Sequence, residues 1–238
     1  MLTDSPLLLA IAYFGGNTLA TLLLYWRIVK LYKPDNSKTD PAMFSYGKHL
    51  SVISLLSGLA GSIDQILLFQ FVGPIELAIY NFATAIPDQT KGPIKTLDRM
   101  IQAQFANRSD ADIRRGMRSK ILILFIFSVV MSGLYIVLAP FIYKIFFPAY
   151  MDAVFYSQIY ALSYIGTAFV PATSYLTAKK RVREQYISSI TTSIVWILTL
   201  FVAVYFWGLL GLIVALTIVR CATPLLNYLL YRFADAEK

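Results

Sequence analysis

The chain has 238 residues, of which 58% are hydrophobic and 14% charged, and its mean hydropathy is +0.63. A soluble domain carries about 25% charged residues, so this composition argues against a soluble protein. The formal charge of +8 does not indicate nucleic-acid binding, because the basic residues lie in loops between apolar segments, where membrane topology explains them. One cysteine and one histidine exclude an intramolecular disulfide, a thiolate metal cluster and a multi-histidine metal site.

Seven segments are long and apolar enough to cross a bilayer as helices, which takes about 20 residues each. They are residues 6–32, 49–73, 75–97, 120–143, 153–178, 185–207 and 209–231. The third is the weakest, since Pro87, Gly92 and Pro93 should kink or open it. The cytoplasmic stretch 98–120 is long enough for an interfacial helix, and residues 109–112 supply an N-cap with acids in the first turn. We therefore predict an all-α integral membrane protein with seven transmembrane helices.

Lysines and arginines concentrate in every second loop. Five lie between the first and second spans, eight between the third and fourth, four between the fifth and sixth, and two after the seventh. The opposite loops contain only Lys144, and Arg220 lies within the last span. Because basic loops stay in the cytoplasm, we predict a multi-pass protein of the inner (plasma) membrane, with its N-terminus outside and its C-terminus cytoplasmic.

Two opposite charges lie at similar depth inside predicted spans. Counted along the helices, Asp64 lies about 13 Å and Arg220 about 15 Å below the outer ends. A guanidinium in hydrocarbon is costly and needs a partner or a hydrated cavity. We expect these two side chains to form an ion pair or to share a polar cavity. The pair would serve either transport or helix packing alone.

Further polar residues within the spans are candidates to line a cavity. Asp88 and Gln89 occupy the interrupted part of the third span, and broken helices expose backbone groups that line cavities. Asp88 lies about 20 Å from the outer end of its span, and the cytoplasmic rim is the alternative position for it. Asn17 faces either a cavity or a neighbouring helix. The other candidates are Tyr80, Asn81 and Asn227.

The sequence contains no recognisable enzymatic motif. It lacks a glycine-rich phosphate loop followed by Lys-Ser or Lys-Thr, and His49, the single histidine, lies at a predicted interface, where a Ser/His/Asp triad is not credible. Asp110 and Asp112 suit a helix N-terminus better than a glycosyltransferase metal site. We expect neither catalysis nor a cofactor nor a bound metal.

Three stretches together resemble a known transporter family. In the first, an aspartate, an apolar run, a glycine-containing turn and a tyrosine follow one another, matched here by Asp64, Gly73 and Tyr80. The other two are residues 139–150, and residues 176–180 followed by the turn at 207–211. In order and spacing over residues 44–231 they resemble the second lobe of polysaccharide (O-antigen type) flippases, in the multidrug/oligosaccharidyl-lipid/polysaccharide exporter superfamily.

The resemblance implies a single transmembrane helix and basic cytoplasmic linker over residues 1–43, and a six-helix lobe of a two-lobe transporter over 44–238. It implies translocation of polyprenyl-diphosphate-linked oligosaccharide by alternating access, with this substrate and membrane lipids as partners. Half of the cavity wall would be absent, which implies a partial or truncated flippase, completed by an N-terminal lobe on another polypeptide or by a second copy. The anionic diphosphate would need a buried cation, for which Arg220 is the membrane-centred candidate.

Two alternatives are open. One is an exporter lobe for small cations or drugs, although one buried arginine beside an aspartate favours an anionic substrate. The other is a non-transporting membrane subunit of a polysaccharide assembly complex. A membrane-bound polymerase or glycosyltransferase is disfavoured, because such enzymes need large extramembrane loops and those predicted here are short.

Overall fold

The computed structural model describes residues 6–33, 41–61 and 63–236. Residues 34–40, which belong to the predicted basic linker, lie outside the described residues. Within the described ranges every regular element is a helix and no strand occurs, which confirms the predicted all-α class. The chain divides into two units, Met1–Ser45 and Tyr46–Lys238. The first contains the 27-residue helix α1, Pro6–Tyr32, which covers the first predicted span.

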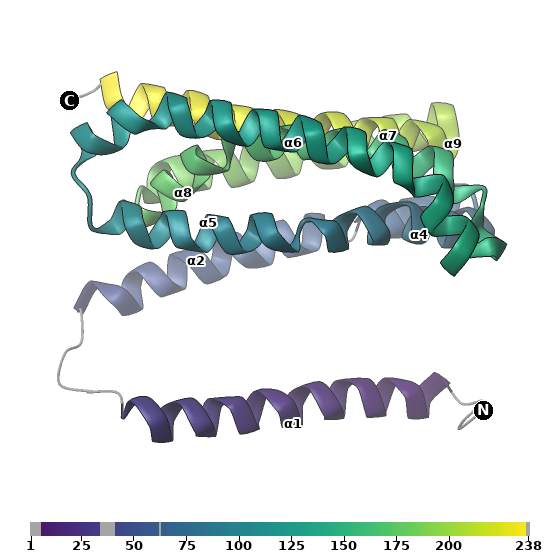
Figure 1. Cartoon of the computed structure of the whole chain (residues 1–238), viewed down its shortest axis with the longest axis horizontal. Coiled ribbons are helices and arrows are strands. Elements are labelled where there is room, and N and C mark those ends of the chain that lie inside the picture. Colours follow the sequence, from purple (N-terminus) through teal and green to yellow (C-terminus); the bar gives the residue numbers. More distant parts are fainter. Residues whose placement is uncertain (1–5, 34–40, 62, 237–238) are drawn as a thin grey trace. The chain divides into compact units, whose positions relative to one another are not determined.

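The second unit begins inside α2 and contains the remaining helices, whose axes run roughly in one direction (Figure 1). In chain order they are α2 (Pro41–Ala60), α3 (Ile63–Phe71), α4 (Pro74–Thr90), α5 (Gly92–Ala106), α6 (Asp110–Phe146), the 3₁₀ turn η1 (Pro148–Tyr150), α7 (Ala153–Ala161), the 3₁₀ helix η2 (Leu162–Phe169), α8 (Val170–Ala178) and α9 (Val182–Ala236).

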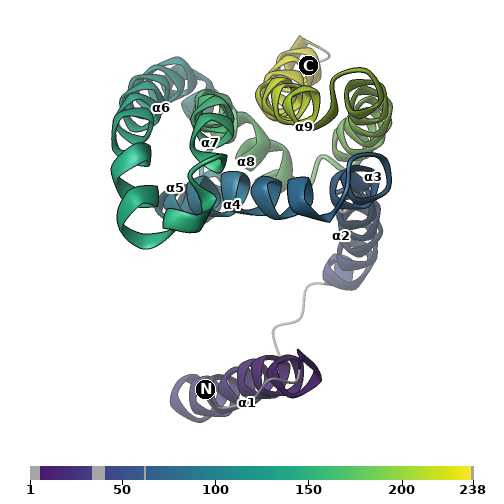
Figure 2. The same ribbon diagram turned by 90° about the vertical axis from the view of Figure 1, so that its right-hand side faces the viewer.

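The segment from α7 through η2 to α8 forms the centre of this unit. It contacts α4, α5, α6 and α9, and Figure 2 shows α7 and α8 lying between α6 and α9. Small buried residues such as Ser157, Gly166 and Ala172 allow this position, because they let neighbouring helices approach closely. A Cβ atom on Gly166 would lie 2.6 Å from the carbonyl oxygen of Arg220, so the backbones of η2 and α9 are nearly in contact there.

Polar and apolar side chains of the second unit are distributed as in a membrane protein. Large apolar side chains of α6 and α9 point outward; Val137 and Phe206, for example, are 65% and 66% exposed. The interior instead holds buried polar side chains: Asp64, Lys91, Ser128, Ser132, Ser157, Ser163, Ser174, Ser188, Ser189, Ser193, Thr217 and Asn227. An apolar exterior is costly in water and stable against lipid.

Three helical stretches among the described residues are long and apolar enough to cross a membrane: Asp110–Phe146, Ala153–Ala178 and Val182–Phe233. They support a membrane-embedded helical protein. These three stretches do not confirm the prediction of seven spans. The second predicted span is divided between α2 and α3, and the third is divided between α4 and α5.

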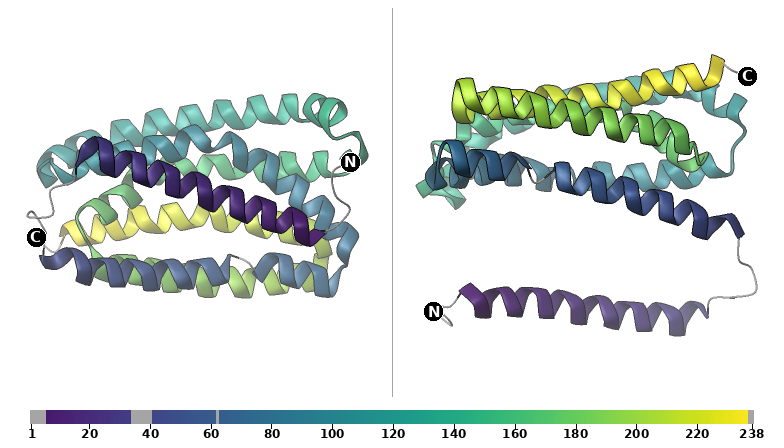
Figure 3. Two further views of the ribbon diagram at one scale, coloured as in Figure 1. Left: turned by 90° about the horizontal axis from the view of Figure 1, so that it is seen from below. Right: turned by 180° about the vertical axis from the view of Figure 1, so that it is seen from behind.

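The third of these stretches, α9, folds back on itself at Gly208. This residue has φ 56° and ψ −137°, a left-handed conformation that glycine adopts without the strain of a Cβ atom. The two arms, 182–207 and 209–236, lie antiparallel (Figure 3), and the Ser188 hydroxyl of the first donates a hydrogen bond to Asn227 of the second. The turn predicted between the last two spans is therefore present, and the hairpin contains two helical arms.

The third predicted span is interrupted where the sequence indicates. Helix α4 ends at Thr90 and α5 begins at Gly92, with Lys91 between them. The expected N-cap at Ser109 is present, but the expected extent of the interfacial helix, 98–120, is wrong. Helix α6 begins at Asp110, with the Ser109 hydroxyl accepting the Asp112 N–H at 3.2 Å, and runs unbroken into the fourth span, because no proline divides the basic stretch from the apolar one.

Replacing Gly166 with alanine should destabilise the bundle by about 1–3 kcal/mol, since the new methyl group cannot fit without separating η2 from α9. Gly133→Ala on α6 is the matched control, because a Cβ atom there meets nothing within 4 Å. Denaturant unfolding of the purified protein in detergent measures both variants. Equal stabilities would contradict the close packing at Gly166.

Candidate functional site

One carboxylate and two cations meet in the interior of the second unit. Asp88 lies in the last turn of α4, and Lys91, three residues later, donates to its Oδ1 atom from 2.9 Å. Arg220 reaches the same oxygen from the second arm of α9, with Nη1 at 3.2 Å. The hydroxyl of Tyr160, on α7, donates to it from 2.8 Å. The charge of this cluster is therefore +1 when all three groups are ionised.

The ring of Tyr160 also contacts both cations. Lys91 Nζ lies 4.6 Å and the guanidinium carbon of Arg220 lies 5.0 Å from the centre of its ring. Cations are attracted to the face of an aromatic ring, so the buried ring (0% exposed) helps to hold two like charges close together. Lys91 also donates to the Ser163 hydroxyl at 3.1 Å, which fixes it to the central segment.

The interruption of the third span is what places Asp88 and Lys91 here. Proline removes the hydrogen bond to residue i−4 and weakens the preceding helical turn; Pro87 lies inside α4, and a second proline, Pro93, lies at the start of α5. The Pro87 carbonyl accepts hydrogen bonds from Tyr164 at 2.8 Å and Thr90 at 2.7 Å. These side chains stabilise the helix end, so Asp88 and Lys91 are presented on one face at the junction of α4 and α5.

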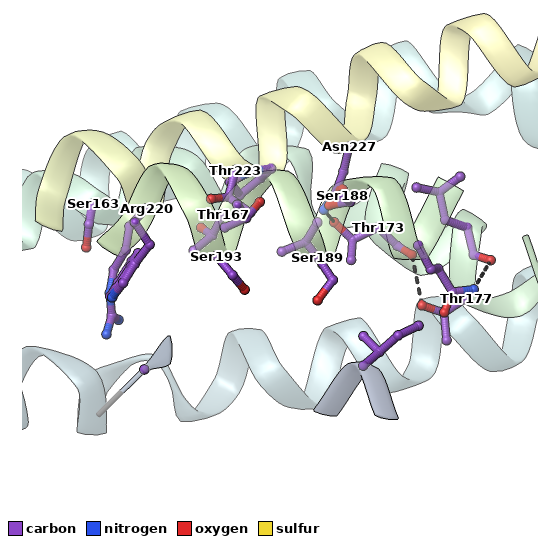
Figure 4. Close-up of a pocket in the computed structure, with 18 of the residues that line it drawn as sticks. Ser163, Thr167, Thr173, Thr177, Ser188, Ser189, Ser193, Arg220, Thr223 and Asn227 are labelled. Atoms are coloured by element: carbon purple, nitrogen blue, oxygen red, sulfur yellow. Dashed lines mark hydrogen bonds between the residues drawn. The ribbon is translucent and has the colours of Figure 1, made fainter. Parts of the chain in front are cut away.

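A cavity of about 570 Å³ lies beside the cluster, within the second unit. Figure 4 shows Arg220 at one end and Thr177 toward the other, with hydroxyl groups between them. Its polar lining residues are Lys91, Ser163, Thr167, Thr173, Thr177, Gln185, Ser188, Ser189, Thr192, Ser193, Trp196, Arg220, Thr223 and Asn227. No carboxylate is among the described residues that line it, while two cations are. The cavity is therefore suited to a polar molecule that carries negative charge.

Two polar stripes along α9 form much of this lining. On the first arm, the polar residues recur at intervals of three and four, so they share one helical face. They are Gln185, Ser188, Ser189, Thr192, Ser193 and Trp196. On the second arm Arg220, Thr223 and Asn227 follow the same spacing. The sequence reasoning missed the first stripe, although its helical period within an otherwise apolar span was a visible signal.

The candidate residues divide into several groups in the structure. Arg220 and Asn227 line the cavity, and Asn227 is held there by its Nδ2 donating to Thr173 at 2.9 Å. Asp88 is not among the lining residues, but it binds the two cations that are. Asp64 and Tyr80 form a separate buried pair, in which the Tyr80 hydroxyl donates to the carboxylate.

The expected ion pair between Asp64 and Arg220 is wrong. The carboxylate partner of Arg220 among the described residues is Asp88. Depth along a helix follows from residue counting, but the face on which a side chain lies depends on the helix rotation of about 100° per residue and on its neighbours. Asp64 is turned toward α4, where Tyr80 satisfies it.

Three further candidates are not among the residues that line the cavity. Asn81 and Gln89 are exposed on α4. Asn17 lies on α1 in the first unit, where its backbone carbonyl accepts the Thr21 hydroxyl at 2.8 Å. The described residues also contain no group of three His, Cys, Asp or Glu that could hold a metal ion.

Comparisons of the chain with protein-family models, with curated proteins and with solved structures give no match. The functional argument therefore depends on the cavity and its residues.

Asp88 and Arg220 should be more strongly coupled than Asp64 and Arg220. A double-mutant cycle with Asp88→Asn and Arg220→Gln, followed by unfolding in detergent, should give an interaction energy of about 0.5–3 kcal/mol, because the two groups are in direct contact. The same cycle with Asp64→Asn is the control and should give a smaller value, because Asp64 is bonded to Tyr80 and not to Arg220. A larger coupling for Asp64 would contradict the arrangement described here.

Proposed function

We propose that the chain is one lobe of a transporter that moves a polyprenyl-diphosphate-linked oligosaccharide across the inner membrane by alternating access. The observation that carries this proposal is the lining of the cavity: two cations, many hydroxyls and, among the described residues, no carboxylate. A diphosphate is anionic and accepts hydrogen bonds, and both guanidinium and ammonium groups bind phosphate well. The resemblance to polysaccharide flippases agrees with this chemistry.

The charge of the cluster is an argument for an anionic substrate over a cationic one. Asp88 is already bound by Lys91, Arg220 and Tyr160, so a cationic drug would find no available carboxylate among the described residues of the lining. An incoming phosphate, in contrast, meets a site with an excess of positive charge. Cations of this kind also mark substrate paths in membrane proteins, because their burial in lipid is costly.

The substrate lipid and the apolar exterior fit one another. The isoprenoid tail remains in hydrocarbon beside the outward-facing side chains of α6 and α9, while the charged headgroup enters the hydroxyl-lined interior. In this proposal the basic loops lie on the cytoplasmic side of the membrane, where they attract anionic lipid. In this proposal a second lobe, either another polypeptide or a second copy of the chain, closes the cavity during transport.

The transport proposal is tested in liposomes that contain the purified chain together with any protein that co-purifies with it. A fluorescent polyprenyl-diphosphate disaccharide should cross the bilayer faster than in protein-free liposomes. Arg220→Ala should slow the crossing about tenfold, since it removes a charged contact that is half-buried, with 34% of each side chain exposed. Arg220→Lys should retain part of the rate, because lysine keeps the charge without the bidentate geometry.

Binding of the same lipid in detergent distinguishes two failures. Binding without crossing shows that the second lobe is required, whereas the absence of both contradicts the proposal. Unchanged crossing in Arg220→Ala contradicts the role of the cation, and movement of a fluorescent cationic dye in place of the lipid would favour a drug exporter.

Membrane topology is tested with single cysteines, since Cys221 is the only native one. In a Cys221→Ser background, Asn107→Cys and Ala149→Cys place thiols at exposed sites before and after α6. A membrane-impermeant maleimide added to intact cells should label position 149 and leave position 107 unlabelled until the membrane is opened. The reverse pattern would contradict a cytoplasmic C-terminus.

A further inference from the structure

The hydroxyl wall of the cavity extends well beyond the charged cluster. Ser193, Thr167 and Thr223 follow Arg220 along the cavity, and Ser189 and Thr173 lie farther toward Thr177 (Figure 4). A site for phosphate alone would need only the end that holds Lys91 and Arg220. The remaining length is neutral, and its hydroxyl groups both donate and accept hydrogen bonds.

Two polar groups at this wall have no partner among the described residues. They are the Thr192 hydroxyl and the indole N–H of Trp196, and both atoms are buried. Buried polar groups are nearly always hydrogen-bonded, so an unsatisfied one requires an explanation. Both residues line the cavity, one helical turn apart on the first arm of α9. Both side chains therefore border the space that a ligand in the cavity would occupy.

We propose that this wall is a carbohydrate subsite, in which sugar rings lie against the first arm of α9 while the attached diphosphate lies at Lys91 and Arg220. The proposal rests on the proposed function and adds the residues that recognise the glycan and its direction. Sugar hydroxyls donate and accept, as the wall does, and the flat apolar face of Trp196 offers contact to the carbon side of a ring. A volume of about 570 Å³ falls in the range of about 300–1,000 Å³ for small-molecule sites, so the subsite takes the sugars next to the phosphate.

The position of the wall sets the direction of the glycan. Its far end lies at Thr177 and Gln185, beside the basic segment from Lys179 to Arg183 that the positive-inside pattern places in the cytoplasm. The sugars therefore extend from the phosphate toward the cytoplasmic end. Other ligand classes fit less well, because an isoprenoid tail would leave the hydroxyls unpaired and a metal cation would require carboxylate or carbonyl ligands.

The test compares two lipids that differ only in the sugar. Purified full-length protein in detergent is titrated with polyprenyl diphosphate and with polyprenyl-diphosphate-N,N′-diacetylchitobiose. Wild-type protein should bind the glycosylated lipid at least about tenfold more tightly. The double variant Thr192→Val/Ser193→Ala should lose about tenfold in affinity for the glycosylated lipid and change less than about twofold for the bare one, because each lost hydrogen bond is worth a factor of several. Arg220→Ala should weaken binding of both.

The matched control is Ser132→Ala/Ser157→Ala, which removes two buried hydroxyls that bond to backbone carbonyls away from the cavity. It should leave the preference for the glycosylated lipid unchanged. A second measurement uses the variant Trp26→Phe/Trp207→Phe, which leaves Trp196 as the single tryptophan. The glycosylated lipid should shift the fluorescence emission of Trp196 more than the bare lipid does.

The outcomes separate the two proposals. Wild-type protein that binds both lipids equally overturns the carbohydrate subsite and leaves the phosphate site standing. Equal losses for both lipids in Thr192→Val/Ser193→Ala also overturn it, because they would show a general effect on structure. Wild-type protein that binds neither lipid contradicts the proposed function, and the subsite with it.

Discussion

The bundle depends on the contact of Asp88 with Lys91, Arg220 and Tyr160. Each charge alone would be costly inside a membrane protein, and together they are stable because opposite charges, an aromatic face and a polar cavity lie beside them. The contact joins α4, α7 and the second arm of α9, which are far apart in the sequence. It therefore fixes how the beginning, middle and end of the second unit pack. The cluster itself carries a net charge of +1, and this is the charge on which the proposal of an anionic substrate is based.

A second constraint is the close approach of the central segment to its neighbours. Gly166 allows η2 to touch the backbone of α9 beside Arg220, so packing and charge placement share one location. Small hydroxyl residues have two roles, because they permit close helix packing on one face and line the cavity on another. The same side chains would weaken a water-soluble core, but in lipid the driving force for packing is contact between helices and not the removal of apolar surface from water. The fold and the cavity thus arise from the same choice of residues.

The sequence predicted the helical class, the break after Pro87, the turn at Gly208 and the need of Arg220 for a polar partner. Each follows from local chemistry, namely the length of the apolar segments, proline, glycine and charge. It did not predict the partner of Arg220. Asp64 and Asp88 were both acids within spans, and only tertiary packing decides that Tyr80 binds one and Arg220 the other. The expected helix over 98–120 does not form as one piece, because α5 ends at Ala106 and the helix that begins at Asp110 continues into the apolar span. The stripe from Gln185 to Trp196 was predictable from its helical period, but hydroxyl residues carry no charge and did not stand out in an apolar span.

The 3₁₀ helix Leu162–Phe169 gives the central segment an unusual mechanical property. A 3₁₀ helix rises about 2.0 Å and turns about 120° per residue, compared with about 1.5 Å and 100° in an α-helix. Over the eight residues of η2, a change to α geometry would shorten the segment by about 4 Å and turn α8 by about 160° relative to α7, from the differences per residue. The length of η2 and the orientation of α8 relative to α7 are therefore linked, because a change in the hydrogen-bond pattern of η2 alters both together.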